Sequence, residues 1–355
     1  MKQTALRAFI STVVVGSVVV LALALWKLKL ILALLFLGFI VAAAMRPGIE
    51  ALRRRGVPRV VGILVHYAGL LALIAALLWA VVPRALDQVQ TALGDLPQTR
   101  SDLRQEARDS SGLRSRVLVG IEQRLERLPR VEDLIDEGAG IGLVAFEVFI
   151  GIFFVLATAA YWIYERKRAE DLVCRLAPSK HAKTVRDTWE LIDLKLGAYV
   201  RGQGLLVAFV SLALSLVFWA IGLPFWLLIA LFAGVVELVP VIGPLVAGTL
   251  AVGVGLTESI GVAVAAGVAV LLVRLLEDYI VIPRVLGEAV GLSPLIVLVS
   301  VAASAVLFGE FAVLLAIPLA AVVATLVDVI VLNKDPADEE VPTVLFPAKD
   351  AETAG

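Results

Sequence analysis

The chain has 355 residues, of which 60% are hydrophobic and only 18% are charged, and its formal net charge is −1. A mean hydropathy of +0.96 excludes an ordinary soluble globular protein and indicates a polytopic membrane protein. The single cysteine, Cys174, excludes an internal disulfide, and with only two histidines we expect no structural zinc site and no cofactor.

The first 82 residues contain three apolar runs, each near the length of about 20 residues that crosses a hydrocarbon core of about 30 Å. These runs lie at about residues 9–26, 30–45 and 60–82. The connection between the second and third runs contains one acid, Glu50, and five arginines: Arg46, Arg53, Arg54, Arg55 and Arg59. Short arginine-rich connections stay in the cytoplasm, so the N-terminus is also predicted to be cytoplasmic. No small-residue cleavage site follows the first run, so we interpret it as a retained span and not as a signal peptide.

A polar segment follows over residues 83–139, with apolar residues at helical spacing: Leu118, Ile121, Leu125 and Leu128. We expect extracytoplasmic amphipathic helices here, as a spacer, an oligomer contact or a cap that gates the substrate. A fourth span is predicted over 140–164, and the charges directly after it mark a cytoplasmic exit. Residues 165–197 are then expected to form cytoplasmic amphipathic helices, split at Pro178.

Residues 198–332 are predicted to form the transport core, because proline and glycine interrupt their apolar stretches. Within the stretch 225–256, two prolines and a glycine fall in five residues: Pro240, Gly243 and Pro244. Each proline removes a backbone donor and blocks a continuous helix. At membrane depth, a broken backbone is tolerated only where it is buried in protein or lines a water-filled cavity.

The stretch 294–332 is interrupted in a similar way, at Gly309 and Pro318. We therefore expect two broken or re-entrant hairpins of opposite orientation, each made of two half-helices or two spans, around a site near the midplane. If 225–256 instead crosses the membrane once, the predicted side of the C-terminus changes. The tail 333–355 is acidic and is expected to be disordered and cytoplasmic.

Four ionisable groups in this core are candidates for a mechanism. Arg274 is three and four residues from Glu277 and Asp278, so one helix face brings the cation to both acids. These three form either an interfacial salt bridge or a gate or coupling element. Glu237 has no partner close in sequence, and burial disfavours a charged carboxylate, which would make it protonatable near neutral pH. Alternatively, it faces a water-filled vestibule or pairs with Arg201 or Arg274.

Several short blocks resemble the autoinducer-2 exporter family of bacterial inner-membrane proteins, also called PerM-type permeases. The family's Ile-Pro-Tyr-Ile-Gly-Pro signature is matched by Val239–Pro244, with Val241 in place of tyrosine. Many relatives carry asparagine in place of Asp278, and Ala312 replaces a second glycine of the family. The other matching blocks are Pro47 and Leu52, Gly56–Arg59, Glu277–Asp278, Ile280–Pro283, Gly287, Gly291–Pro294, Leu307–Gly309 and Ala316–Pro318.

This resemblance implies a homo-oligomeric transporter, of pentameric assembly, that exports a small signalling molecule or exchanges sodium or lithium for protons. The fold expected is all-α and polytopic, with about seven to eight hydrophobic spans. The substrate or ion pathway is assigned to Glu237, Pro240, Gly243, Pro244, Arg201, Arg274, Glu277, Asp278, Pro283, Gly287, Pro294, Gly309 and Pro318.

The leading hypothesis is a secondary transporter of a small polar solute in the bacterial inner membrane. The alternatives are a sodium(lithium)/proton antiporter and a membrane scaffold that transports nothing. No Walker A pattern, intramembrane catalytic triad or His-Glu-x-x-His motif occurs, so we expect neither ATP hydrolysis by that route nor another enzyme activity. The expected partners are the lipid bilayer and a small solute or ion, and no nucleic acid.

Overall fold

The computed structural model describes residues 2–93, 131–239, 242–285, 292–339 and 341, and in these ranges every regular element is a helix. Most of the predicted extracytoplasmic segment, residues 94–130, therefore lies outside the described residues. The α-helices are α1 (Lys2–Lys27), α2 (Lys29–Arg54), α3 (Arg59–Leu93), α6 (Val131–Leu176), α7 (Ala182–Ala220), α8 (Trp226–Val236), α9 (Ile242–Glu258), α10 (Ile260–Leu276), α11 (Ile282–Val285), α12 (Pro294–Phe308) and α13 (Ala316–Ile330). Three short elements complete the fold: the 3₁₀ turns η1 (Ser179–His181) and η3 (Glu310–Leu315), and the π-helical turn η2 (Glu277–Val281).

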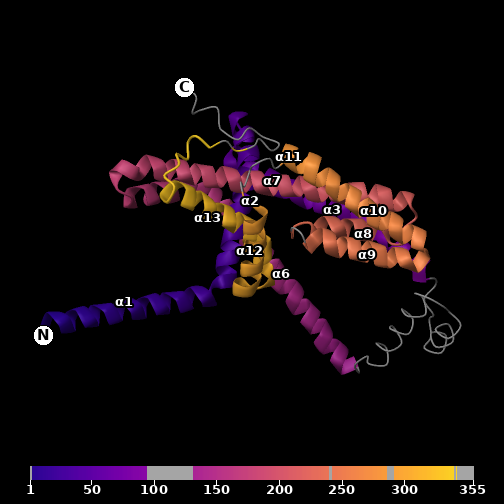
Figure 1. Ribbon diagram of the computed structural model, residues 1–355, viewed down its shortest axis with the longest axis horizontal. Helices are drawn as coiled ribbons and strands as arrows, with labels where there is room; N and C mark the ends of the chain where they lie inside the picture. The colour runs from indigo at the N-terminus through magenta and orange to yellow at the C-terminus, as the bar shows by residue number, and fades with distance from the viewer. Residues whose placement is uncertain (1, 94–130, 240–241, 286–291, 340, 342–355) are drawn as a thin grey trace.

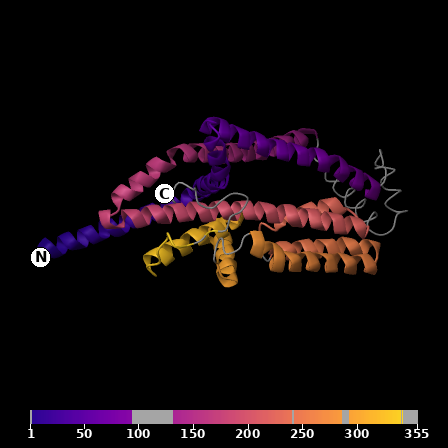
Figure 2. The ribbon, with the colours of Figure 1, turned by 90° about the horizontal axis from the view of Figure 1, so that it is seen from above.

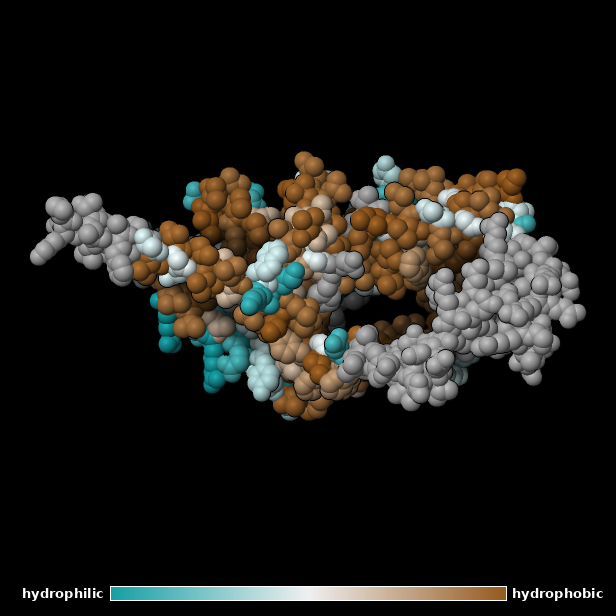
Figure 3. Space-filling view, turned by 90° about the horizontal axis from the view of Figure 1, so that it is seen from below, coloured by the Kyte–Doolittle hydropathy of each residue, from teal (hydrophilic) through white to brown (hydrophobic). Residues whose placement is uncertain are grey.

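Six of the described helical stretches are long and apolar enough to cross a membrane, and four further apolar helices are shorter. Large hydrophobic side chains are exposed along almost all of them, as Figure 3 shows for one face of the molecule. A bilayer accounts for this exposure, because lipid tails solvate such side chains as well as a protein core does. The prediction of an all-α polytopic membrane protein is confirmed.

Helices α6 and α7 are longer than a single span requires. With 46 and 39 residues, they measure about 69 Å and about 58 Å, against a hydrocarbon core of about 30 Å. Each continues without a break through a predicted span and a predicted amphipathic segment. The chain turns only at Pro178, between the end of α6 and the beginning of α7.

Small residues let α2 approach its neighbours closely. A Cβ built on Gly38 would lie 2.7 Å from the Thr158 Cβ of α6, and one on Gly197 of α7 would lie 2.6 Å from the Ala43 carbonyl oxygen. Close backbone approach of this kind promotes helix association in lipid. The lipid tails are as apolar as the helix surfaces, so the hydrophobic effect does not drive the helices together. Helix α2 is thereby fixed to both α6 and α7.

Helix α7 lies between two groups of helices. Figure 2 shows it between α3 and α6 on one side and α9, α10 and α13 on the other. Its apolar residues join those of α8, α9, α10 and the connection between α7 and α8 in one buried cluster: Val210, Leu214, Phe218, Leu223, Ile229, Ala230, Ala233, Ala247, Ala251, Ala266, Ala269 and Val273. Figure 1 shows α8, α9 and α10 side by side beneath the end of α7.

Helices α9 and α10 form an antiparallel pair. Ser259 begins the turn, and its hydroxyl accepts a hydrogen bond from the Val262 N–H, which satisfies one of the unpaired donors at the start of α10. A Cβ on Gly255 would lie 2.6 Å from the Ala263 Cα, so the two backbones touch near the turn. This pairing brings the far end of α10, with Arg274, back beside the start of α9.

Candidate functional site

The predicted interruption near residue 240 separates two packed helices. Helix α8 ends at Val236, α9 begins at Ile242, and Pro240 and Val241 between them lie outside the described residues. A Cβ on Gly243 would lie 2.4 Å from the Val236 carbonyl oxygen, so only glycine permits this approach without a backbone shift. Pro244 stands in the first turn of α9, where the missing N–H would have had no partner within the helix.

Glu237, the C-cap residue directly after α8, pairs with a cation from another helix. Arg274 Nη1 donates to Glu237 Oε1 across 2.8 Å, and the Glu237 side chain is only 6% exposed. The Gln203 side chain of α7 donates to the backbone carbonyl of Glu237 at 3.2 Å. Residues from α7, α8 and α10 therefore meet at the interruption. Of the partners considered for Glu237, the structure selects Arg274.

Arg274 also contacts the two acids that follow it. Its Nη1 donates to Glu277 Oε2 at 3.2 Å, and its Nη2 lies 2.9 Å from Asp278 Oδ1. Glu277 is almost fully buried, at 2% exposure, whereas Asp278 is 40% exposed. We call Glu237, Arg274, Glu277 and Asp278 the Arg274 cluster.

The π-helical turn η2 positions the second half of this cluster. Pro283 has no N–H, and its ring crowds the carbonyl one turn back, so a regular α-helix is disrupted just before it. The chain adopts the wider π turn over Glu277–Val281, beginning at the buried carboxylate itself. Single π turns inside helices often occur at functional sites.

The cluster holds three carboxylates against one guanidinium, and two of these carboxylates are buried. A buried negative charge is tolerated only when it is paired, hydrogen-bonded or neutralised. One guanidinium balances the charge of one buried carboxylate, so the second buried carboxylate requires a proton or a cation, whereas the exposed Asp278 does not. Within the described residues, no group of His, Cys, Asp and Glu is arranged to hold a metal ion.

The other predicted pathway residues are distributed over the core. Arg201 donates to the Ala44 carbonyl oxygen of α2 at 3.3 Å. Pro294 begins α12, where the Ser293 side chain accepts from the Ile296 N–H, and Gly309 ends that helix with a φ of 94°. Pro318 is buried in the first turn of α13. Gly287, like Pro240, lies outside the described residues.

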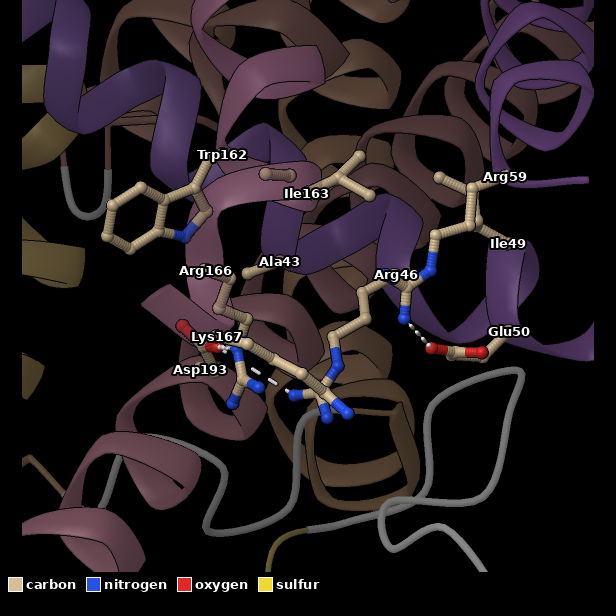
Figure 4. Close-up of a pocket in the computed structure, with 11 residues that line it drawn as sticks. Ala43, Arg46, Ile49, Glu50, Arg59, Trp162, Ile163, Arg166, Lys167 and Asp193 are labelled. Carbon is tan, nitrogen blue, oxygen red and sulfur yellow. Dashed lines mark hydrogen bonds and ion pairs between the residues drawn. The ribbon is translucent and has the colours of Figure 1, made fainter. Parts of the chain in front are cut away.

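A second group of charges was missed by the sequence analysis. Arg166 of α6 is buried and pairs with Asp193 and Glu190 of α7, and Arg46 of α2 lies 2.9 Å from Glu190. Figure 4 shows Arg46, Arg166 and Asp193 converging in one pocket. Beside them, the Trp162 ring stacks on Phe39 of α2 and on Trp189 of α7, with centroids 4.1 Å and 5.7 Å apart. Only the packing of three helices creates this group, and no local spacing signals it.

Comparison with known proteins identifies the family of a chain with this architecture. The model of the AI-2E family transporter matches residues 15–332, which is most of the sequence. The chain belongs to this family of transporters. Among similar proteins, "Putative transport protein YrrI" of Bacillus subtilis is 24% identical over 307 residues, covering 83% of this chain and 85% of YrrI. "Putative transport protein MT0215" of Mycobacterium tuberculosis is 26% identical over 330 residues, covering 89% of this chain and 88% of MT0215.

A buried lysine of this AI-2E family transporter also lacks an assigned role. Lys195 of α7 is 6% exposed, and its Nζ lies 3.2 Å from the Thr325 hydroxyl of α13. The carboxylate paired with it is Glu339, 2.6 Å away, in the segment that follows α13. Val341 of the same segment packs near the fully buried Ala198 of α7. The described start of the C-terminal tail thus lies against α7, beside α13.

Proposed function

We propose that this transporter moves a small polar solute, such as an autoinducer-2-like signalling molecule, across the bacterial inner membrane by a secondary mechanism. The Arg274 cluster carries this proposal, because it places an excess of buried carboxylates at an interrupted helix. Interrupted helices with charged groups are common sites for substrates and coupling ions in secondary transporters. The antiporters among the relatives implied by the sequence resemblance are consistent with a coupling role.

In the proposed mechanism, the Arg274 side chain alternates between two sets of carboxylate partners. In the state described here it binds Glu237 and Glu277 through the same nitrogen. When a proton or a cation binds at one carboxylate, that carboxylate attracts Arg274 less strongly. The guanidinium then pairs with the carboxylates that remain charged. Because Glu237 belongs to the end of α8 and Glu277 to η2, this change alters the contact between the two elements.

The topology that accompanies this proposal has both termini in the cytoplasm. The arginine-rich connection after α2 supports a cytoplasmic N-terminus. The short length of α8, 11 residues or about 16 Å, supports a re-entrant hairpin of α8 and α9, because it is too short to span. A homo-oligomer, pentameric by family resemblance, completes the proposed assembly. Residues 83–139 and 165–197 are proposed to lie outside and inside the cell, respectively.

The test is flux into proteoliposomes containing the purified full-length protein, with pH and sodium gradients imposed separately. Glu237→Gln removes one negative charge with little change of shape. If a proton or cation at Glu237 couples transport, this variant loses the gradient dependence, whereas Arg284→Gln, at an exposed position on α11, retains it. Uncoupled solute export that is unaffected by Glu237→Gln would contradict the coupling role of the cluster.

A sodium(lithium)/proton antiporter is the second candidate, and the buried carboxylates Glu237 and Glu277 favour it because proton exchange needs acidic groups. It is distinguished in the same vesicles by sodium or lithium flux that drives proton movement without any organic solute. Absence of all flux, together with stable capture of another protein, would instead favour the scaffold function.

A further inference from the structure

An apolar groove runs along the surface between α2 and α6. It has a volume of about 400 Å³ and is lined by Leu35, Phe39, Phe154, Ala157, Thr158, Tyr161, Trp162 and Glu165. Tyr161 is 73% exposed, so the groove opens to the surroundings of the helices. In a bilayer, the surroundings of this surface are lipid chains.

The groove and a neighbouring polar pocket share one lining residue, Trp162. Trp162 precedes Arg166 by one turn on α6, and Phe39, which lines the groove, precedes Arg46 of the pocket by about two turns on α2. The pocket has a volume of about 50 Å³, and its charged residues are Arg46, Arg59, Arg166, Lys167, Glu50 and Asp193. Four cations and two acids therefore line this pocket (Figure 4).

The cations at the pocket differ in how firmly they are paired. Arg166 is buried and held by Asp193 and Glu190, so it is part of the wall. Arg59 is more accessible, at 28% exposure, and lies 3.3 Å from Glu50. Lys167 is exposed and forms no ion pair within the described parts of the chain. The mouth of the pocket thus offers Lys167 and Arg59 to an anion.

We propose that the groove and the pocket together bind one anionic phospholipid. One acyl chain lies along the groove between Phe39 and Tyr161, and the phosphate is bound by Lys167 and Arg59, with Trp162 between the two parts. Basic pockets between helices on the cytoplasmic side are suited to anionic headgroups. The arginine-rich connection predicts this end of α2 to be cytoplasmic. A free phosphate ion would use the pocket alone and leave the adjoining groove unfilled.

The test is native mass spectrometry of the full-length protein titrated with phosphatidylglycerol or with phosphatidylcholine of the same acyl chains. We expect a preference for phosphatidylglycerol that falls about five-fold for each cation removed, in Lys167→Gln and in Arg59→Gln. Arg284→Gln, an exposed arginine on α11, is the control and should retain the preference. Ala157→Trp should weaken binding of phosphatidylglycerol by filling the groove while leaving every charge in place.

Four results would overturn the proposal. Equal binding of the two lipids by the unaltered protein would show that no headgroup site exists. A preference that survives in the Lys167→Gln/Arg59→Gln double variant would show that these two cations do not form it. Competition by glycerol phosphate as strong as that by the whole lipid would identify a soluble phosphate as the ligand. A change of subunit number in Ala157→Trp, without a change in lipid binding, would assign the groove to a second copy of the chain. None of these measurements depends on transport.

Discussion

Arg274 Nη1 lies 2.8 Å from Glu237 Oε1, although the two residues are 37 positions apart in the chain. The same nitrogen lies 3.2 Å from Glu277 Oε2, only one turn along. One guanidinium thus connects the interruption after α8 with the π turn after α10. If either contact is lost, a buried carboxylate is left without its cation.

Replacing Arg274 by Met should destabilise the folded protein by about 2–3 kcal/mol. Breaking a fully buried ion pair costs about 3–5 kcal/mol, and the lower figure is expected because Arg274 is 28% exposed. The measurement is the thermal midpoint of the purified protein in detergent. Arg274→Lys keeps the charge but not the forked donors, and it should be intermediate. An unchanged midpoint for Arg274→Met would show that the cluster is not a buried charge network.

Neutralising the two neighbouring acids should have unequal effects. Glu277 is 2% exposed and accepts from Arg274, whereas Asp278 is 40% exposed. Glu277→Gln should change both stability and the gradient dependence of flux, whereas Asp278→Asn should change stability by less than about 1 kcal/mol, as for exposed pairs. Equal effects of the two substitutions on stability would contradict this difference in burial.

Gly243→Ala should be disruptive, because the added Cβ would lie 2.4 Å from the Val236 carbonyl oxygen, where the backbone must move. Gly253→Ala is a matched control in the same helix, since nothing lies within 4 Å of its Cβ. In a helix interior, alanine is more favourable than glycine by about 0.5–1 kcal/mol, so the control should be neutral or stabilising. Thermal unfolding of both variants decides the point. A tolerated Gly243→Ala would show that α8 and α9 do not approach as closely as described.

Lys195 and Glu339 should be energetically coupled. Glu339→Gln leaves a buried ammonium with only the Thr325 hydroxyl, which disfavours the packed position of the segment after α13. Hydrogen exchange of residues 331–339 should accelerate in this variant. Lys195→Met together with Glu339→Gln should restore part of the loss, and a double-mutant cycle measures the coupling. Additive effects of the two substitutions would show that the pair contributes nothing to holding this segment.

The sequence by itself determined the class of fold and the place of the interruption. Apolar runs of about 20 residues require helices in lipid. Proline disrupts the helix only over the few residues next to it, independently of how the helix packs. The contacts of Arg274 with Glu277 and Asp278 are local for the same reason, since residues three and four apart share a helix face.

Only the tertiary structure decided which distant residues meet. The partner of Glu237 is Arg274 because α9 and α10 pair through small residues in one register, and a shift of that register would separate the two side chains. The contacts of Arg166 with Asp193 and of Lys195 with Glu339 depend in the same way on how helices and the tail pack. Many helix registers satisfy one hydrophobic pattern, and side-chain volume, close backbone approach and the pairing of buried charges select among them.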